Sequence, residues 1–301
     1  MDQKTRADRI LGCLMGGAIG DALGAAFENQ PTVSRGVPFP LGCEDSLYVT
    51  DDTQLTLATC EGIALAGRID AEAIAQRFVV WFRERRISGI GASTLKAITE
   101  LAAGAHWALA GASGERSAGN GAAMRVAPLA FFLDPTDDID RRTLHDLCRI
   151  THRNEEAYCG ALAIVTAVRM AAEGAVLQQE LLPRLVNLLP DSLTRDRLES
   201  ALTEKLTLFQ AAKKFGTSGH VAASVPLAIL HAIEGHRDVA SLMGFVTGVG
   251  GDTDTIGSMA GQILGASLGA AKMKFDESLF EQIDLAPEVK EAARNLAAIP
   301  A

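Results

Sequence analysis

The sequence predicts an all-α fold, and three observations support this. Apolar residues recur at spacings of three and four along most of the chain, which is the period of an amphipathic helix. Alternation typical of strands is scarce, and Ala, Leu and Gly dominate the composition. No low-complexity linker or tandem repeat divides the 301 residues. We therefore expect one domain over residues 1–301, a compact orthogonal helical bundle of about thirteen helices.

The expected helices follow one another through short loops. From the apolar period we predict helices over 5–27, 53–66, 70–85, 91–109, 121–131, 139–151, 154–173, 177–188, 194–213, 218–233, 237–247, 254–272 and 286–297. Two longer stretches are expected to be loops, namely 29–49 with its Pro-containing turns and the Gly- and Ser-rich 111–120. Long loops in compact domains often carry function.

The first and a late predicted helix each carry a glycine ridge of period four. The ridges consist of Gly12, Gly16, Gly20 and Gly24, and of Gly257, Gly261, Gly265 and Gly269. Each glycine costs a helix interior about 1 kcal/mol relative to alanine. A flat ridge at this spacing lets a neighbouring helix approach closely. We therefore predict two central, tightly packed helices rather than a membrane dimer motif, because acidic residues lie beside both ridges.

Charge and composition limit the partners. The chain is 48% hydrophobic and 22% charged, with a formal net charge of −9 and a pI near 5.2. An acidic protein repels nucleic acid and anionic membranes, so neither is expected as a partner. No membrane span is expected, because no apolar run approaches the roughly 20 residues that cross a bilayer. No signal peptide is expected, because the N-terminus mixes charges and lacks an apolar h-region and a cleavage site. A cytoplasmic monomer is the expectation.

The five cysteines favour a reducing compartment. They are Cys13, Cys43, Cys60, Cys148 and Cys159. Their number is odd and no two are spaced as CxxC, so a disulfide framework or a zinc site is not indicated. Most lie in apolar, helix-like surroundings, and we interpret them as buried thiols.

Two clusters of aspartate and threonine carry the strongest chemical signal. Thr50-Asp51-Asp52-Thr53 and Gly250–Thr255 (GGDTDT) both stand where a loop enters an apolar helix. Four carboxylates and several hydroxyls without nearby His or Cys suit Mg²⁺, Mn²⁺ or Ca²⁺ rather than zinc. The alternative is that each cluster is a helix N-cap, a position that favours Asp and Thr, with Asp52 or Thr53 capping the first helix.

Three weaker motifs accompany these clusters. Asp21, in GDALG, and Glu28 are seven residues apart and share a face if the first helix persists. Ser117–Arg125 (SAGNGAAMR) is a Gly-rich stretch entering a helix, which offers backbone N–H groups to a phosphate. His152 follows Thr151 just before another helix. Each has an ordinary alternative: a solvated helix end, a plain loop, and a capping or packed histidine.

Taken in order, GDALG…E, TDDT, SxGNGAAMR, TH and GGDTDTIG make the chain similar to the ADP-ribosylglycohydrolase family. The match runs from about Leu11 to Gly269, and TDDT paired with GGDTDT is its most specific part. The resemblance implies a compact all-α enzyme that removes ADP-ribose from modified protein side chains by hydrolysis at the anomeric carbon of the ribose.

The resemblance also implies the site. Two Mg²⁺ or Mn²⁺ ions would be bound by Thr50, Asp51, Asp52, Asp252, Asp254 and Thr255. ADP-ribose would lie across them, contacting Asp21, Ser117, Gly119, Asn120, Gly121, Met124 and His152. The catalytic residues would be Asp52 and Asp252 together with Glu28, which matches the family's mobile carboxylate near the scissile bond and is our candidate acid or base.

The linkage and two other functions stay open. Arginine-linked ADP-ribose is favoured, but arginine-directed bacterial relatives carry an Asp just before an Ile-Gly pair, and here that position is Gly89. A carboxylate there would hold a guanidinium. One alternative function is a non-catalytic ADP-ribose binder. The other is an HD-type metal phosphohydrolase, suggested by His145-Asp146 but without the further His ligands which that site needs.

Overall fold

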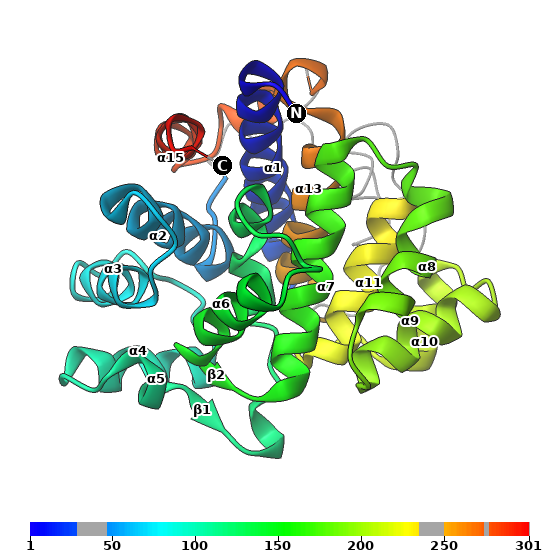
Figure 1. The fold of residues 1–301 in the computed structure, drawn as a ribbon, viewed down its shortest axis with the longest axis horizontal. Helices are drawn as coiled ribbons and strands as arrows, with labels where there is room; N and C mark the ends of the chain where they lie inside the picture. Colours follow the sequence, from blue (N-terminus) through cyan, green and yellow to red (C-terminus); the bar gives the residue numbers. More distant parts are fainter. Residues whose placement is uncertain (29–46, 235–249, 274–276, 301) are drawn as a thin grey trace.

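Two helices from opposite ends of the chain run side by side through the centre of the structure. They are α1 (Gln3–Ala25) and α13 (Thr253–Leu268), blue and orange in Figure 1. This computed structural model describes residues 1–28, 47–234, 250–273 and 277–300. Both central helices are buried along most of their length, which agrees with their apolar sequences.

The glycine ridges of α1 and α13 face each other. Gly12 lies against Gly265, Gly16 against Gly261, and Gly20 against Gly257. A Cβ on any of these six glycines would lie 2.0–2.5 Å from the carbonyl oxygen of its counterpart, where no side chain fits. The prediction that both ridges mark closely packed central helices is confirmed. The facing register also brings the C-terminal end of α1 beside the N-terminal end of α13.

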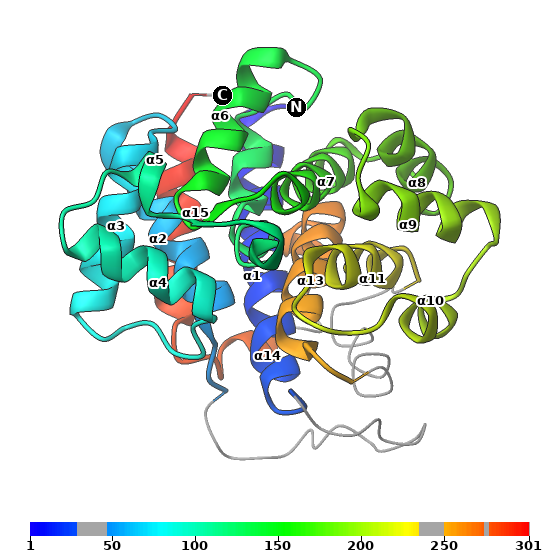
Figure 2. The same ribbon diagram turned by 90° about the horizontal axis from the view of Figure 1, so that it is seen from below.

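The other helices surround this central pair. Figure 2 shows α1 and α13 between one group of helices, α2 to α5, and another, α8 to α11. The bounds are α2 (Asp51–Ala66), α3 (Ala71–Arg83), α4 (Ala92–Ala102), α5 (Trp107–Ala110), α6 (Asp138–Arg149), α7 (Glu155–Glu173), α8 (Leu177–Leu188), α9 (Leu193–Thr203), α10 (Leu208–Phe215), α11 (Val221–Glu234), α14 (Glu277–Phe280) and α15 (Ala286–Ala298). Short 3₁₀ helices occupy Glu115–Ser117, Ala123–Arg125, Ala127–Phe131 and Ala270–Lys272. The prediction of an all-α bundle is confirmed.

Three predicted helices are divided, each for a local reason. The segment 91–109 breaks after α4, where Gly104 takes a left-handed backbone with φ +96°. The segment 194–213 breaks at Lys205, with φ +52°, before Thr207 caps α10. The segment 121–131 forms two 3₁₀ helices, because Pro128 lacks an N–H and the Gly121 carbonyl accepts a hydrogen bond from the Arg125 side chain.

Other expectations differ from the structure or concern residues outside the described ranges. The segment 254–272 ends as an α-helix at Leu268, because Gly269 is left-handed with φ +75°. The helix predicted over 237–247, most of the loop 29–49, and Cys43 lie outside the described residues. The short α14 and a parallel pair of two-residue strands, β1 (Ala112–Ser113) and β2 (His152–Arg153), were not predicted.

The four cysteines in the described ranges are buried thiols, as expected. Cys13, Cys60, Cys148 and Cys159 are buried free thiols, and burial raises the pKa of each. None of the helices within the described ranges is long and apolar enough to cross a membrane.

Candidate metal centre and ligand cavity

The N-terminal end of α2 is held by a carboxylate from α1. Asp21 is fully buried and accepts hydrogen bonds from the backbone N–H groups of Thr50 and Thr53, at 3.0 Å each to Oδ2. It also accepts from the two hydroxyls, at 2.7 and 2.6 Å. Asp21 therefore caps α2 from another helix. Its carboxylate lies behind the cluster and is not among the side chains that line the neighbouring cavity.

Neither aspartate–threonine cluster caps its own helix through a side chain. The N-cap residues are Thr50 for α2 and Asp252 for α13, and neither makes a side-chain capping hydrogen bond. The capping interpretation, in which Asp52 or Thr53 serves α2, is therefore wrong. With Asp21 doing the capping at α2, the carboxylates of Asp51 and Asp52 are available for other contacts.

The two clusters meet although about 200 residues separate them. The Thr255 hydroxyl donates to Asp52 Oδ2 at 3.1 Å across 203 positions of sequence. Thr253 Oγ1 donates to the Gly24 carbonyl at 2.8 Å, which fixes the start of α13 against the end of α1. The glycine ridges thus bring the ends of three helices together, and every residue of the predicted metal set lies at this junction.

A cavity of about 660 Å³ opens beside this junction. Its size is within the range of pockets that bind small molecules and cofactors. Most of the predicted site residues line it, together with residues that sequence reasoning missed: Glu28, Asp51, Gly89, Gly91, Ala92, Ser93, Thr94, Gly119, Asn120, Gly121, Met124, His152, Thr217, Ser218, Gly219, Gly251, Asp252, Asp254 and Thr255.

The carboxylates are buried together, and within the described residues no Lys, Arg or His forms an ion pair with them. Burial, followed by repulsion from neighbouring carboxylates, raises the pKa of Asp51 and of Asp254 to about 7. Burial, followed by repulsion from Asp21 and Asp254, raises the pKa of Asp52 well above its usual range. The pKa of Asp252 is raised for the same first reason. Such a cluster favours a bound cation, which would stabilise the charged forms.

The donor set fits hard divalent cations. Asp52 Oδ1 is buried with no hydrogen-bond partner in the described structure, so it can accept a cation at no loss of an existing bond. Across the described ranges, no three His, Cys, Asp or Glu side chains are already placed to hold one ion. Binding would therefore require carboxylate rotations at this junction.

The Gly-rich segment predicted to bind the ligand forms one wall of the cavity. Its backbone is fixed by Asn120 N donating to the Gly219 carbonyl at 3.0 Å and Val221 N donating to the Ala118 carbonyl at 2.9 Å. The Asn120 side chain donates to Asp252 Oδ2 at 2.6 Å and to Ser224 Oγ at 3.1 Å. The amide of Asn120 therefore connects this wall to the second cluster.

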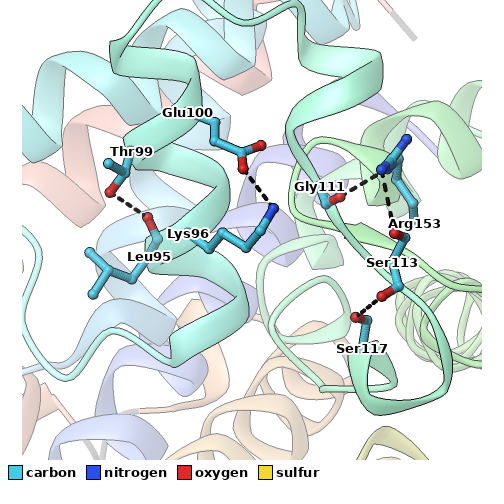
Figure 3. A network of polar contacts seen from close by, with 8 residues as sticks. All are labelled: Leu95, Lys96, Thr99, Glu100, Gly111, Ser113, Ser117 and Arg153. Atoms are coloured by element: carbon cyan, nitrogen blue, oxygen red, sulfur yellow. Dashed lines mark hydrogen bonds and ion pairs between the residues drawn. The ribbon is translucent and has the colours of Figure 1, made fainter.

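The small parallel sheet supports the start of that wall. Figure 3 shows Arg153 of β2 reaching the Gly111 carbonyl, at 2.8 Å, and Ser113. Ser117 Oγ donates to the Ser113 carbonyl at 2.9 Å and closes the turn before the Gly-rich segment. Ser117 is thereby engaged in the fold and does not line the cavity, whereas Gly119, Asn120, Gly121 and Met124 do.

The remaining predicted residues occupy distinct places. Because α1 ends at Ala25, Asp21 and Glu28 do not share a helical face, and the exposed Glu28 lines the cavity while Asp21 is buried. The charge of Glu28 raises the pKa of Asp252. His145 contacts Glu155 on the surface at 3.0 Å and lies away from the cavity, which removes the basis for an HD-type site.

Sequence reasoning missed two parts of the wall. Thr217, Ser218 and Gly219 line the cavity, although residues from 218 onward were expected to be helical. The start of α4, with Ser93 and Thr94, lines it as well. The run Thr217-Ser218-Gly219-His220 before an apolar helix is a loop signal that could have identified the first of these parts.

Divalent cations should stabilise the protein more at high pH than at low pH. Asp51 and Asp254 have folded pKa values near 7, raised from 3.8, so without cations their contribution to stability is full below pH 4 and is lost as the pH rises through 7. A cation removes this penalty, so we expect a larger rise in melting temperature on adding Mg²⁺ or Mn²⁺ at pH 8 than at pH 5.5. At 100 times Kd, a ligand stabilises by about 2.7 kcal/mol.

Scanning calorimetry at both pH values, with chelator or with cation, measures this. Potassium chloride at matched ionic strength controls for screening. Equal shifts at the two pH values would show that the buried carboxylates do not bind the cation.

Comparison with known proteins shows a family likeness over nearly the whole chain. The family model for ADP-ribosylglycohydrolase matches residues 2–300. A solved structure titled ADP-ribosylglycohydrolase-related protein complex superimposes with a TM-score of 0.74 at 27% identity, covering 98% of this chain and 99% of that one.

Two curated relatives have the names of ADP-ribosyl hydrolases. ADP-ribosylhydrolase ARH3 of Gallus gallus is 27% identical, over 87% of this chain and 85% of its own length. ADP-ribosylarginine hydrolase Tri1 of Pseudomonas putida is also 27% identical, over 88% of this chain and 72% of its own length. The Tri1 name specifies arginine and the ARH3 name specifies no linked residue, so these two relatives leave the linkage open.

Proposed function

The chain belongs to the ADP-ribosylglycohydrolase family, and we propose that it is a metal-dependent hydrolase that releases ADP-ribose from modified protein side chains. One observation carries the proposal: two distant acidic clusters share the wall of one cavity with Glu28 and are joined by the Thr255–Asp52 hydrogen bond. Family membership makes it a hydrolase; the metal, the substrate and a cytoplasmic, monomeric state belong to the proposal.

The proposed metal ligands are the predicted ones: Thr50, Asp51, Asp52, Asp252, Asp254 and Thr255. Two Mg²⁺ or Mn²⁺ ions bound there would supply Lewis acidity and orient the ribose hydroxyls and a water. Asp21 keeps Thr50 and the start of α2 in place, and Asn120 keeps Asp252 in place. These contacts fix the geometry on both sides of the junction.

Glu28 is the proposed acid or base. It lies on the cavity wall beyond the end of α1, outside the hydrogen-bonded cluster around Asp21. Hydrolysis at the anomeric carbon passes through an oxocarbenium-like state, and a carboxylate within hydrogen-bond reach can move the proton of the water or of the leaving group. The backbone N–H groups of Gly119 and Gly121 would contact the diphosphate, whereas that of Asn120 is already bonded to the Gly219 carbonyl.

Release of free ADP-ribose from arginine-, serine- and O-acetyl-linked substrates, with and without Mg²⁺ or Mn²⁺, tests the proposal. We expect cation-dependent release from at least one substrate, and its loss in Glu28→Gln. Calorimetric binding of ADP-ribose provides a readout separate from turnover. Tight binding without release from any substrate would instead support the non-catalytic binder.

Arginine-linked ADP-ribose should be a slow substrate that Gly89→Asp improves. Gly89 lies on the cavity wall, and a Cβ there would lie 3.4 Å from Thr50 Cβ and 3.5 Å from Asp51 Oδ1, which are ordinary contact distances. The backbone is left-handed, with φ +76°, a conformation that Asp tolerates better than most residues. A carboxylate here could hold the guanidinium by charge-assisted hydrogen bonds.

Steady-state kinetics of wild type, Gly89→Asp and Gly89→Asn on one arginine-linked substrate measure this. The Asn variant requires the same left-handed backbone but lacks the charge, so only Asp should raise the rate. Glu84 and Glu115, which could have replaced the missing acid, do not line the cavity. The idea fails if wild type already turns over at a typical enzymatic rate, about 1–10 s⁻¹, and the Asp variant brings no gain.

A further inference from the structure

The Nε2 nitrogen of His152 lies against the Gly-rich wall of the cavity, and the Nδ1 nitrogen contacts a buried hydroxyl. His152 is 2% exposed, yet it is part of the cavity wall. A Cβ on Gly119 would lie 3.0 Å from Nε2, so this nitrogen sits against the Gly-rich segment. No residue in the described ranges forms a hydrogen bond with Nε2. Nδ1, by contrast, lies 2.9 Å from the Thr151 hydroxyl.

The Thr151 hydroxyl already accepts a hydrogen bond from a buried arginine. Arg125 Nη2 donates to Thr151 Oγ1 at 2.9 Å and to the Leu147 carbonyl at 3.1 Å. Arg125 Nε donates to the Gly121 carbonyl at 3.2 Å, and its guanidinium carbon lies 4.8 Å from the centre of the Phe78 ring. Arg125 is 0% exposed, so these contacts leave it little freedom to move.

The direction of the hydrogen bond between Thr151 and His152 follows from the single proton of the Thr151 hydroxyl. A hydroxyl has one proton, and a guanidinium can only donate. Since Thr151 is fully buried, its proton requires an acceptor, and His152 Nδ1 is the acceptor that the geometry offers. If Nδ1 carried a proton instead, the Thr151 proton would be buried without a partner, which is unfavourable.

We propose that Arg125 is a positioning residue, which acts through the Thr151 hydroxyl to hold His152 as the Nε2–H tautomer, so that Nε2 donates a hydrogen bond to a ligand oxygen in the cavity. The ligand part rests on the proposed function, in which that oxygen belongs to ADP-ribose. Burial, followed by the charge of Arg125, lowers the pKa of His152 to about 3, so the ring is a neutral donor at physiological pH. The same arginine ties Gly121 to Thr151, so the Gly-rich wall and the histidine keep one relative position.

The opposite tautomer would make the cavity wall less suited to an anion. An unprotonated Nε2 would direct a lone pair at the oxygens of a diphosphate, whereas Nε2–H complements them. A protonated ring would require a second buried positive charge near Arg125, which repels it.

Nitrogen-15 NMR of histidine-labelled protein tests the tautomer without any substrate. Long-range proton–nitrogen spectra distinguish the two neutral tautomers and the cation, and the spectrum of His152→Asn identifies the signals of His152. We expect the Nε2–H form at pH 7. In Thr151→Val, which loses the hydroxyl and keeps the shape, the Nε2–H share should fall, and ADP-ribose should bind roughly 10-fold more weakly in the presence of Mg²⁺.

Thr151→Ser keeps the hydroxyl and should behave as wild type in both measurements. Arg125→Met should change the tautomer as Thr151→Val does. If Arg125→Met does not fold, the comparison of Thr151→Val with Thr151→Ser tests the inference. Finding Nδ1–H or a cation in wild type, or an unchanged tautomer in Thr151→Val, would overturn the inference. An Nε2–H signal in a wild type that binds no ADP-ribose would overturn the proposed function and leave the tautomer assignment standing.

Discussion

Alanine at Asp252 or at Asp254 should abolish turnover, weaken divalent-cation binding and leave the helical content nearly unchanged. Each substitution removes one of the proposed oxygen ligands from the junction, and losses of even supporting groups around metals reduce affinity or activity about 10- to 100-fold. Neither side chain belongs to the apolar core, and Asp252 makes no side-chain cap for α13. We therefore expect activity to fall by more than about 100-fold.

The same substitutions should not lower the melting temperature of the protein in chelator. Burial and the neighbouring Asp252 raise the pKa of Asp254 to about 7, so its charge is unfavourable in the fold at neutral pH. Titration calorimetry with Mn²⁺ and circular dichroism measure both effects, with about two ions per chain expected for wild type. Asp191→Ala, at a side chain 98% exposed, is the matched control. Unaltered cation affinity in both variants would make the ligand assignment wrong.

The sequence predicted the elements of this site better than their arrangement. The acidic clusters and the Gly-rich segment were recognisable because oxygen-rich, cysteine-free motifs at helix starts have a limited set of uses. Asp21 was expected to contact the ligand, whereas its carboxylate caps α2 from another helix. This role could not be read from the sequence, because it depends on the end of α1 packing beside the start of α2.

The divided helices show a second limit to what the sequence predicts. The periodicity of 121–131 is helical, yet the segment forms 3₁₀ turns because a buried guanidinium takes the Gly121 carbonyl. The guanidinium is held in place by tertiary hydrogen bonds to Leu147 and Thr151, and these override a local preference of a few tenths of a kcal/mol per residue. Conversely, the glycine ridges were readable because a Cβ-free stripe has almost no use except close approach. Their partners, however, became known only from the packing of α1 on α13.

Leucine at Gly16 or at Gly261 should strongly destabilise the fold. A Cβ on Gly16 would lie 2.2 Å from the Gly261 carbonyl oxygen, and one on Gly261 would lie 2.0 Å from the Gly16 carbonyl oxygen. Overpacking usually costs about 1–3 kcal/mol. Here the opposing atoms are backbone on both sides and cannot rotate away, so we expect about 3 kcal/mol or more. Chemical denaturation measures the change in unfolding free energy, and Ala66→Leu, at an exposed position of α2, is the control.

The position of a substitution along the ridge should decide whether it also disturbs the site. Gly20 packs on Gly257, one turn from the acidic start of α13, whereas Gly12 packs on Gly265 at the far end. Alanine at either position forces the helices apart, since its Cβ would lie 2.1 Å or 2.4 Å from the facing carbonyl oxygen. Because Asp21 on α1 fixes Thr50, while Asp252 and Asp254 belong to α13, a separation near Gly20 moves the two ligand clusters apart. We therefore expect Gly20→Ala to weaken cation binding more than Gly12→Ala at comparable loss of stability. Equal cation affinities in these two variants would show that the ridge holds the fold without setting the spacing of the site.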